Sequence, residues 1–374
     1  MILYFAVAII TIVISLWVKT GYAEIPYGYT KQQVLNRLCL ISVFLLLFSV
    51  SALRLNVGND YAKYVEYFHL IRCKLDTEVV VPTEFGFNAV CLALYFLSGR
   101  NENYLLMFAV FAFATIYFFL KGMYKQSESF FLSFFLFMTL GYYFQTFSTI
   151  RYYFALALAF VSIPYVLNKQ YIKFVIIVLL GATIHKSLLI VLPMYLLACG
   201  KWKKYHVILL GLICSTTLIF KDFYMDLFLK IYPTYENTRY LDGGTSLINI
   251  ARCAAVLIWS FIEFKDVVKD NRRNLFYFYC NIGALYVYAF FTFLPSVSRM
   301  GYYLSITHIL FIPVLIKGIA NEKLRKVVTA LVMIACIGYF IVFMIYKAPM
   351  DGLRILPYQT FLYHDMVPIL SDVS

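Results

Sequence analysis

Charged residues are scarce in this chain, at 14% of its 374 residues, whereas soluble domains average about a quarter. Hydrophobic residues make up 63% of the chain, and the mean hydropathy is +0.79. This composition excludes an ordinary water-soluble globular protein. The apolar runs also lack the two-residue alternation of a transmembrane β-barrel, so the sequence predicts membrane-spanning helices.

Patterns that bind metal ions or nucleic acid are missing as well. The eight cysteines are scattered, mostly in or beside apolar runs, without Cys-x-x-Cys or Cys/His spacing, so we expect neither a disulfide framework nor a zinc site. An Asp-x-Asp pattern is absent, which favours a reaction without a metal or another cofactor. No basic cluster with interleaved aromatics occurs in a polar stretch, so no nucleic-acid partner is expected.

What the chain does contain is a long series of apolar runs. The predicted fold class is therefore all-α, a polytopic helical membrane protein with about 12–13 apolar segments in one integral membrane domain, residues 1–374. The first run lacks a basic flank and a small-residue cleavage pattern, which predicts a retained span and not a signal peptide. The runs lie at about 2–18, 34–53, 84–98, 103–120, 129–147, 150–167, 171–184, 187–199, 205–221, 246–263, 274–294, 300–316 and 327–346.

The net charge of +13 is distributed unevenly along the chain. Every second connection is basic, and together these connections carry a charge of +11. Lys and Arg are enriched in cytoplasmic loops, so we predict that these connections are cytoplasmic. They are 121–128, 168–173, 200–206, 264–274 and 317–326. The remaining connections sum to zero, so we predict that the loop 222–245 and the tail 347–374 face outward. Lys19, Lys31 and Arg37 flank the connection 19–33, which predicts that this connection is cytoplasmic and that the loop 54–83 faces outward. With this topology the short run 84–98 is re-entrant or interfacial, unless the first two spans are placed wrongly. The pair 171–184 and 187–199 is also short, and helices of that length line a protein-enclosed cavity.

Polar residues gather at the predicted outer ends of the spans, where charge in a membrane protein usually lines a cavity or a reaction path. Arginines from separate helices suit an anionic ligand, and a diphosphate on a lipid carrier is such a ligand. The neighbouring tyrosines are candidates for substrate contacts. The candidate binding residues are Arg54, Arg151, Arg239, Arg299, Tyr61, Tyr64, Tyr240 and Tyr302.

Two further residues near the outer ends of the spans, Asp60 and His185, are candidate general bases for a sugar hydroxyl. Each also has a structural interpretation. Asp60 could cap a helix that begins near Tyr61, and His185 could be a satisfied structural histidine. Arg151 and Arg299 could likewise anchor the ends of spans at the membrane interface. The residue types alone leave both interpretations open.

The order of these residues resembles the EpsG family of bacterial exopolysaccharide proteins, which is close to Wzy-type O-antigen and capsule polymerases. The resemblance runs nearly end to end, and the order and spacing of the motifs make it fairly specific. The matching elements are Arg54 at a span end with Gly58, Asp60, Tyr61 and Tyr64 (Gly-x-Asp-Tyr-x-x-Tyr); Glu84, Gly86 and Phe87 (Glu-x-Gly-Phe); Arg151; His185, Lys186 and Ser187; Arg299; and Pro357 with Tyr358.

The resemblance implies a polymerase in the bacterial cytoplasmic (inner) membrane, with the architecture of C-type glycosyltransferases. Such an enzyme moves an oligosaccharide chain from undecaprenyl diphosphate onto the terminal sugar hydroxyl of another lipid-linked repeat unit, at the outer face. It would work with a flippase and a chain-length regulator of the same pathway. By this analogy Asp60 is the essential acid of the first outer loop, and Arg151 and Arg299, with Arg54 and Arg239, hold diphosphate.

Other classes of protein stay open at this point. A flippase or transporter for the same lipid-linked units would also use arginines, but it would place them through the membrane midplane. A glycosyltransferase that moves a single sugar from a lipid donor is not separated from a polymerase by these motifs. An O-acyltransferase would be expected to show a more developed His/Asp or His/Glu arrangement than His185 alone.

Overall fold

The computed structural model describes residues 1–21, 30–73, 84–100, 103–231, 247–294 and 297–363. Within these ranges the regular structure is helical and no strand occurs, apart from one isolated bridge between Arg54 and Thr360. The all-α prediction is therefore confirmed. Contacts between residues divide the chain into two compact units, which are described separately.

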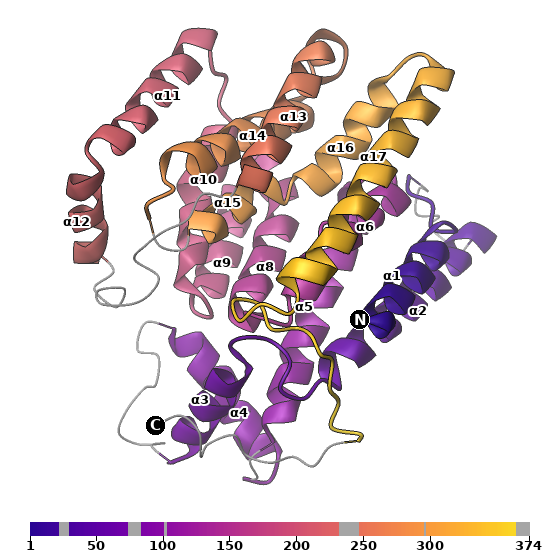
Figure 1. Ribbon diagram of the computed structural model, residues 1–374, viewed down its shortest axis with the longest axis vertical. Coiled ribbons are helices and arrows are strands. Elements are labelled where there is room, and N and C mark those ends of the chain that lie inside the picture. Colours follow the sequence, from indigo (N-terminus) through magenta and orange to yellow (C-terminus); the bar gives the residue numbers. More distant parts are fainter. Residues whose placement is uncertain (22–29, 74–83, 101–102, 232–246, 295–296, 364–374) are drawn as a thin grey trace. The chain divides into compact units, whose positions relative to one another are not determined.

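The first unit comprises Met1–Ser162, Ile176–Leu189 and Asn321–Ser374. In it α1 packs against α2 and α6, α2 packs against α5, and α17 packs against α6 (Figure 1). Two shorter helices, α3 and α4, lie against each other, and α4 also contacts α5. The helices are α1 (Ile2–Ser15), α2 (Lys31–Ala52), α3 (Tyr61–Cys73), α4 (Phe85–Leu97), α5 (Tyr104–Gln126), α6 (Phe130–Thr139), α7 (Tyr142–Gln145) and α17 (Glu322–Val342), which continues as a π-helix over Phe343–Lys347.

The second unit comprises Ile163–Val175 and Ile190–Ala320. Its central helix is α14, which contacts α10, α11, α13, α15 and α16. The pair α11 and α12 is bent by 90° (Figure 1). The helices are α10 (Val191–Ala198), α11 (Lys204–Ile219), α12 (Lys221–Ile231), α13 (Leu247–Ile262), α14 (Arg272–Phe290), α15 (Val297–Ser305) and α16 (His308–Gly318). Two helices have residues in both units, α8 (Ile150–Leu167) and α9 (Tyr171–Ala182).

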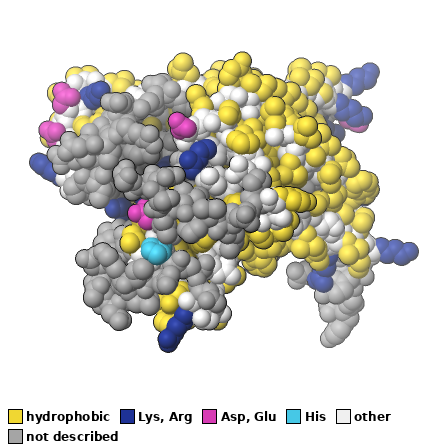
Figure 2. Space-filling model, turned by 60° about the horizontal axis from the view of Figure 1, so that its bottom comes forward, with side chains coloured by type: hydrophobic (Ala, Val, Ile, Leu, Met, Phe, Trp, Pro, Cys, Tyr) yellow, Lys and Arg dark blue, Asp and Glu magenta, His cyan; other side chains and the backbone are white. Residues whose placement is uncertain are grey.

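Among the described residues, five helical segments are long and apolar enough to cross a membrane, or six if the bent pair α11 and α12 forms one span. The five are Lys31–Ala52, Tyr104–Gln126, Ile150–Leu167, Val297–Gly318 and Glu322–Lys347. Many exposed side chains on these and neighbouring helices are large and hydrophobic, among them Leu38, Ile208 and Leu331. Figure 2 shows hydrophobic side chains over much of the described part of one face. The chain is a multi-pass helical membrane protein, as the composition predicts.

The apolar runs match the helices in place but not always in length. The predicted run 129–147 is interrupted at Gly141, whose φ of +78° ends α6 and precedes the single turn α7. The run 84–98 forms the 13-residue helix α4, which reaches only about 20 Å and falls short of a bilayer core of about 30 Å. The predicted loops 54–83 and 222–245 contain or overlap helices of their own, α3 and α12.

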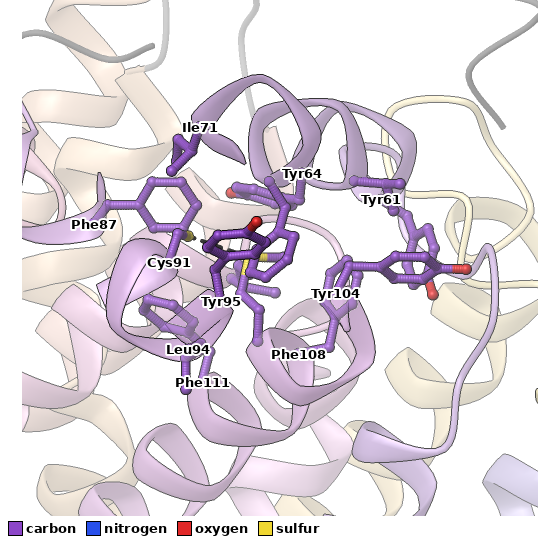
Figure 3. Packing of buried hydrophobic residues seen from close by; sticks show 14 of the residues in the cluster. Tyr61, Tyr64, Ile71, Phe87, Cys91, Leu94, Tyr95, Tyr104, Phe108 and Phe111 are labelled. Atoms are coloured by element: carbon purple, nitrogen blue, oxygen red, sulfur yellow. Dashed lines mark hydrogen bonds between the residues drawn. The ribbon is translucent and has the colours of Figure 1, made fainter. Parts of the chain in front are cut away.

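An aromatic core holds α3 on α4 and α5. Tyr61 of α3 stacks on Phe108 of α5, with ring centroids 4.2 Å apart and an interplanar angle of 7°. Tyr64, one turn later, lies 6.0 Å from Phe87 of α4 between ring centroids. Figure 3 shows these rings pointing toward one another between the three helices. Because α3 begins directly after Asp60, this packing also positions the backbone at Asp60.

Candidate functional site

The centre of the site is the Glu84 carboxylate, at the residue that precedes α4. Its Oε2 accepts a hydrogen bond from Arg151 Nη1, and its Oε1 accepts from His185 Nδ1 at 2.7 Å and from the Lys186 backbone N–H at 3.2 Å. Glu84 is 4% exposed. The three side chains Glu84, Arg151 and His185, hereafter the Glu84 site, form a buried network of one ion pair and a carboxylate–histidine hydrogen bond within the first unit.

Close backbone contact brings these segments together. The Gly86 N–H donates to the Thr183 carbonyl oxygen at 2.9 Å. A Cβ at Gly86 would lie 2.1 Å from Thr183 Oγ1, so a side chain at this position would push the two segments apart. Glu84 thereby reaches the turn after α9, where His185 lies between Ala182 and the 3₁₀-helix Lys186–Ile190. Gly86 is needed here for the close approach of two backbones.

Arg151 lies in the first turn of α8 and is surrounded by aromatic rings. Its guanidinium carbon is 4.8 Å from the Phe87 ring centroid, 5.4 Å from that of Tyr64 and 5.5 Å from that of Tyr67. These distances are within the range of cation–π attraction. The rings and Glu84 therefore hold the Arg151 cation in a fixed orientation, although its side chain is still 13% exposed.

Electrostatics settle the protonation of two groups in the site. Burial by itself would raise the pKa of Glu84, but the interactions with His185 and Arg151 outweigh burial, so the pKa of Glu84 lies below its ordinary value. The ionised carboxylate can only accept hydrogen bonds, and His185 Nδ1 must then carry a proton. Burial also raises the pKa of Tyr64 to about 12, and its hydroxyl stays protonated at neutral pH.

Asp60 lies beside the Glu84 site, in the loop before α3. Its side chain is half-buried, and its Oδ2 accepts a hydrogen bond from Thr149 Oγ1 at 3.3 Å. Thr149 is only two residues before Arg151. Tyr64 is within electrostatic range of both Asp60 and Arg151. The structure thus brings Asp60, Arg151 and His185, predicted separately from the sequence, into one region of the first unit.

Arg54 has a different environment from Arg151. It is 1% exposed, and its Nη1 donates to the carbonyl oxygen of Ser51 and, at 3.0 Å, to the Ser51 hydroxyl. Its guanidinium carbon lies 5.0 Å and 5.2 Å from the ring centroids of Phe108 and Phe147. A cation at the C-terminal end of α2 also interacts favourably with the helix dipole. These contacts give Arg54 a structural role, and its predicted binding of diphosphate stays a prediction.

The remaining predicted residues lie elsewhere. Arg299 and Tyr302 are on α15 in the second unit, and both are partly buried. Arg239 and Tyr240 lie outside the described residues. Tyr61, at 1% exposed, packs in the aromatic core, and it supports the position of α3.

Glu84 is the residue that sequence reasoning left out of the candidate site. Two signals pointed to it, namely an acidic residue at the start of an apolar run and its place in the Glu-x-Gly-Phe element. Its partners are 67 and 101 positions away in the chain, so no local pattern announces the contact. The Glu84 carboxylate orients the His185 ring, a contact that fits both a satisfied structural histidine and a general base.

The arrangement is suited to proton transfer next to an anion. A carboxylate that binds the Nδ1–H of a histidine orients the ring and leaves Nε2 as the atom that can take up a proton. Arg151 adds a positive charge in surroundings of low dielectric constant, where a developing negative charge is stabilised strongly. Among the residues that the structure describes, no group of three or more His, Cys, Asp or Glu side chains is placed to hold a metal ion.

Fold and site together define a multi-pass helical membrane protein with a buried carboxylate, arginine and histidine network. The model of the EpsG family matches residues 37–360, nearly the whole chain, and the protein belongs to the EpsG family. The family resemblance seen in the sequence is confirmed. EpsG is a family of Wzy-like polymerases, and membership supports a role of the polysaccharide-polymerase kind. No curated protein and no solved structure matches the chain.

Proposed function

We propose that this protein is a polysaccharide polymerase of the bacterial cytoplasmic membrane. It transfers an oligosaccharide chain from undecaprenyl diphosphate onto the terminal sugar hydroxyl of another lipid-linked repeat unit at the outer face. The observation that carries the proposal is the Glu84 site, with Asp60 beside it, in a member of the EpsG family. The predicted outward position of the 54–83 loop supports the outer face as the place of reaction.

In this reaction the hydroxyl oxygen of the acceptor sugar forms a bond to the anomeric carbon of the donor chain. The bond between that carbon and the diphosphate oxygen breaks, and the diphosphate leaves with the electron pair. The hydroxyl proton passes to a base. His185 Nε2 is our first candidate for this base, because Glu84 orients the ring. Asp60 is the second, because its carboxylate is half-exposed and held only by Thr149 in the described part of the chain.

Arg151 acts on the leaving group in this proposal. Glu84 engages Nη1, and the Arg151 side chain, which is 13% exposed, has further N–H groups that can donate to phosphate oxygens. Arg299, on α15, is a further candidate for the diphosphate. The tyrosines Tyr64 and Tyr302, with Tyr240, stay candidates for substrate contacts. A chain-length regulator and a flippase are the expected partners in the pathway.

The test uses a deletion strain that lacks the protein and is complemented with wild type, Arg151→Lys or Asp60→Asn. Surface polysaccharide is compared at matched levels of the protein in the membrane. Arg151→Lys keeps a cation next to Glu84 but removes the planar fork, so it separates diphosphate binding from folding. The proposal expects long chains only with wild type, and single repeat units with the two variants.

Arg100→Ala is the matched control, because Arg100 is exposed and lies outside the site. It should give long chains. Long chains with both Arg151→Lys and Asp60→Asn would show that the proposed site is wrong. Loss of even the single unit in the deletion strain, with lipid-linked units retained in the inner leaflet, would indicate a flippase instead.

A further inference from the structure

The C-terminal segment of the chain folds back onto the loop that carries Asp60. We call residues 350–361 the C-terminal clasp and residues 53–60 the Asp60 loop. Four backbone hydrogen bonds join them, although about 300 residues separate them in the sequence. The bonds are Leu55 N to Gln359 O (3.0 Å), Gly58 N to Arg354 O (2.8 Å), Asn59 N to Leu353 O (3.0 Å) and Phe361 N to Leu53 O (3.3 Å).

Buried contacts anchor the C-terminal clasp to the first unit. Ile355 is 0% exposed, and its carbonyl oxygen accepts a hydrogen bond from the hydroxyl of the buried Tyr4 at 2.8 Å. Tyr358 donates to the carbonyl oxygen of Val50, near the end of α2, at 3.0 Å. The rings of Tyr4 and Tyr358 also meet edge to face, 5.7 Å apart between centroids. The clasp is thus bound to α1 and α2 as well as to the Asp60 loop.

The opposite side of the Asp60 loop rests on residues 147–149, which lead into α8. Gly58 has φ +112°, and a Cβ there would lie 2.0 Å from the Phe147 carbonyl oxygen. Only glycine satisfies both the dihedral angle and the contact. Side chains join the same two segments through Ser148 Oγ to Asn59 Oδ1 and Thr149 Oγ1 to Asp60 Oδ2 (3.3 Å).

The Asp60 loop is therefore held between two segments, and one of them leads directly to Arg151. Three of the four backbone bonds are donated by amides of the loop itself, those of Leu55, Gly58 and Asn59. Without the clasp these amides would turn to water, and the loop would gain conformational freedom. A change of about 1 Å at a reacting group is enough to lower a rate by two orders of magnitude.

We infer that the C-terminal clasp is a positioning element that holds Asp60 at a fixed place beside Arg151 and the Glu84 site. The inference rests on the proposed function of that site. The clasp contributes no group to the reaction. Its removal leaves the arginine, histidine and carboxylate side chains in the chain but frees the loop that carries Asp60.

The test is amide hydrogen exchange on the full-length protein in membranes, combined with polymer profiling. Ile355→Ala opens a cavity under the clasp, Ile355→Val retains most of the side chain, and Tyr363→Ala is a control at a residue 84% exposed. In Ile355→Ala we expect the amides of the Asp60 loop to exchange at least about tenfold faster, whereas α2 and α3 keep their protection. Polymer per molecule of protein should fall at least about tenfold and return in Ile355→Val.

A chain that ends at Ala348 is the second variant and lacks the whole clasp. Unchanged exchange in the Asp60 loop of this chain or of Ile355→Ala would overturn the inference, because the clasp then does not hold the loop. Faster exchange with full polymer would also overturn it. The Asp60→Asn variant is measured in parallel to separate the two proposals. Full polymer with Asp60→Asn would refute the role of Asp60 and, with it, the inference about the clasp. If Asp60→Asn makes no polymer, but a clasp variant shows faster exchange together with full polymer, only the role of the clasp is refuted.

Discussion

The sharpest perturbation of the site is Glu84→Gln, because it removes one charge and leaves the shape of the side chain nearly unchanged. Glu84 carries three hydrogen bonds, from Arg151, from His185 and from the Lys186 amide. Glutamine offers one acceptor oxygen and one donor group in place of two acceptor oxygens. At least one of these three donors must then lose its acceptor.

The expected cost in stability follows from burial. Glu84 is 4% exposed, so solvent screens these interactions little. Breaking a buried ion pair by removing one partner costs about 3–5 kcal/mol, because an uncompensated charge stays behind. The amide oxygen replaces part of the lost interaction, and a hydrogen bond to a charged group contributes about 1.5–3 kcal/mol. We therefore expect a loss of about 2–4 kcal/mol in the free energy of unfolding.

Activity should fall by more than the loss of folded protein explains. The carboxylate fixes the proton on His185 Nδ1, whereas an amide can either accept or donate there. If the proton moves from Nδ1 to Nε2, Nε2 can no longer act as a general base, and general-base catalysis contributes about 10²–10⁴-fold to a rate. Polymer formation per folded molecule should drop within this range if His185 is the base.

The measurement is thermal unfolding in detergent together with the polymer profile at matched membrane levels. Glu322→Gln is the matched control, because Glu322 pairs with Lys326 at 2.8 Å on an exposed surface and this pair contributes at most about 1 kcal/mol. A Glu84→Gln protein with wild-type stability and wild-type polymer would refute the assigned network. Lower stability with unchanged polymer per folded molecule would limit Glu84 to a structural role and favour Asp60 as the base.

Three further predictions follow from other contacts. Gly58→Ala should lower the free energy of unfolding by about 1–3 kcal/mol and reduce polymer, because Gly58 has φ +112° and a Cβ there would collide with the Phe147 carbonyl oxygen. The control is Gly338→Ala in α17, where a Cβ would meet nothing within 4 Å. In the same unfolding assay it should be neutral or stabilising by about 0.5–1 kcal/mol. Because the pKa of Glu84 is lower in the folded protein, its ionised carboxylate stabilises the fold fully above about pH 4.3. This stabilisation is lost as the pH falls through the pKa of Glu84 in the folded protein. Thermal unfolding between about pH 3 and 6 should therefore show a fall in unfolding temperature that the Glu84→Gln variant lacks. Arg54→Ala should lower the amount of folded protein in the membrane, because it vacates a fully buried position between two aromatic rings; normal protein levels with shortened polymer would instead support the predicted contact with diphosphate.

Much of the site could be predicted from residue types and their places at the ends of apolar runs. Asp60, Arg151 and His185 were found this way and do lie together in the first unit. The same reasoning treated Arg54 and Arg151 alike, because both are arginines at span ends. Their packing differs, because Arg54 is enclosed by Ser51 and two rings, whereas the Arg151 side chain is 13% exposed and paired with Glu84.

The membrane class, the family and the helices within apolar runs follow from local sequence, because a bilayer demands long apolar stretches with internally paired backbones and such stretches can be read along the chain. The partners of Glu84 and the C-terminal clasp on the Asp60 loop could not be read in this way. Their residues are 67 to about 300 positions apart, and they meet only because α3, α4, α8 and the C-terminal segment pack in one arrangement. Composition and periodicity report which face of a helix is apolar, but the choice of which polar side chains meet depends on how the helices pack.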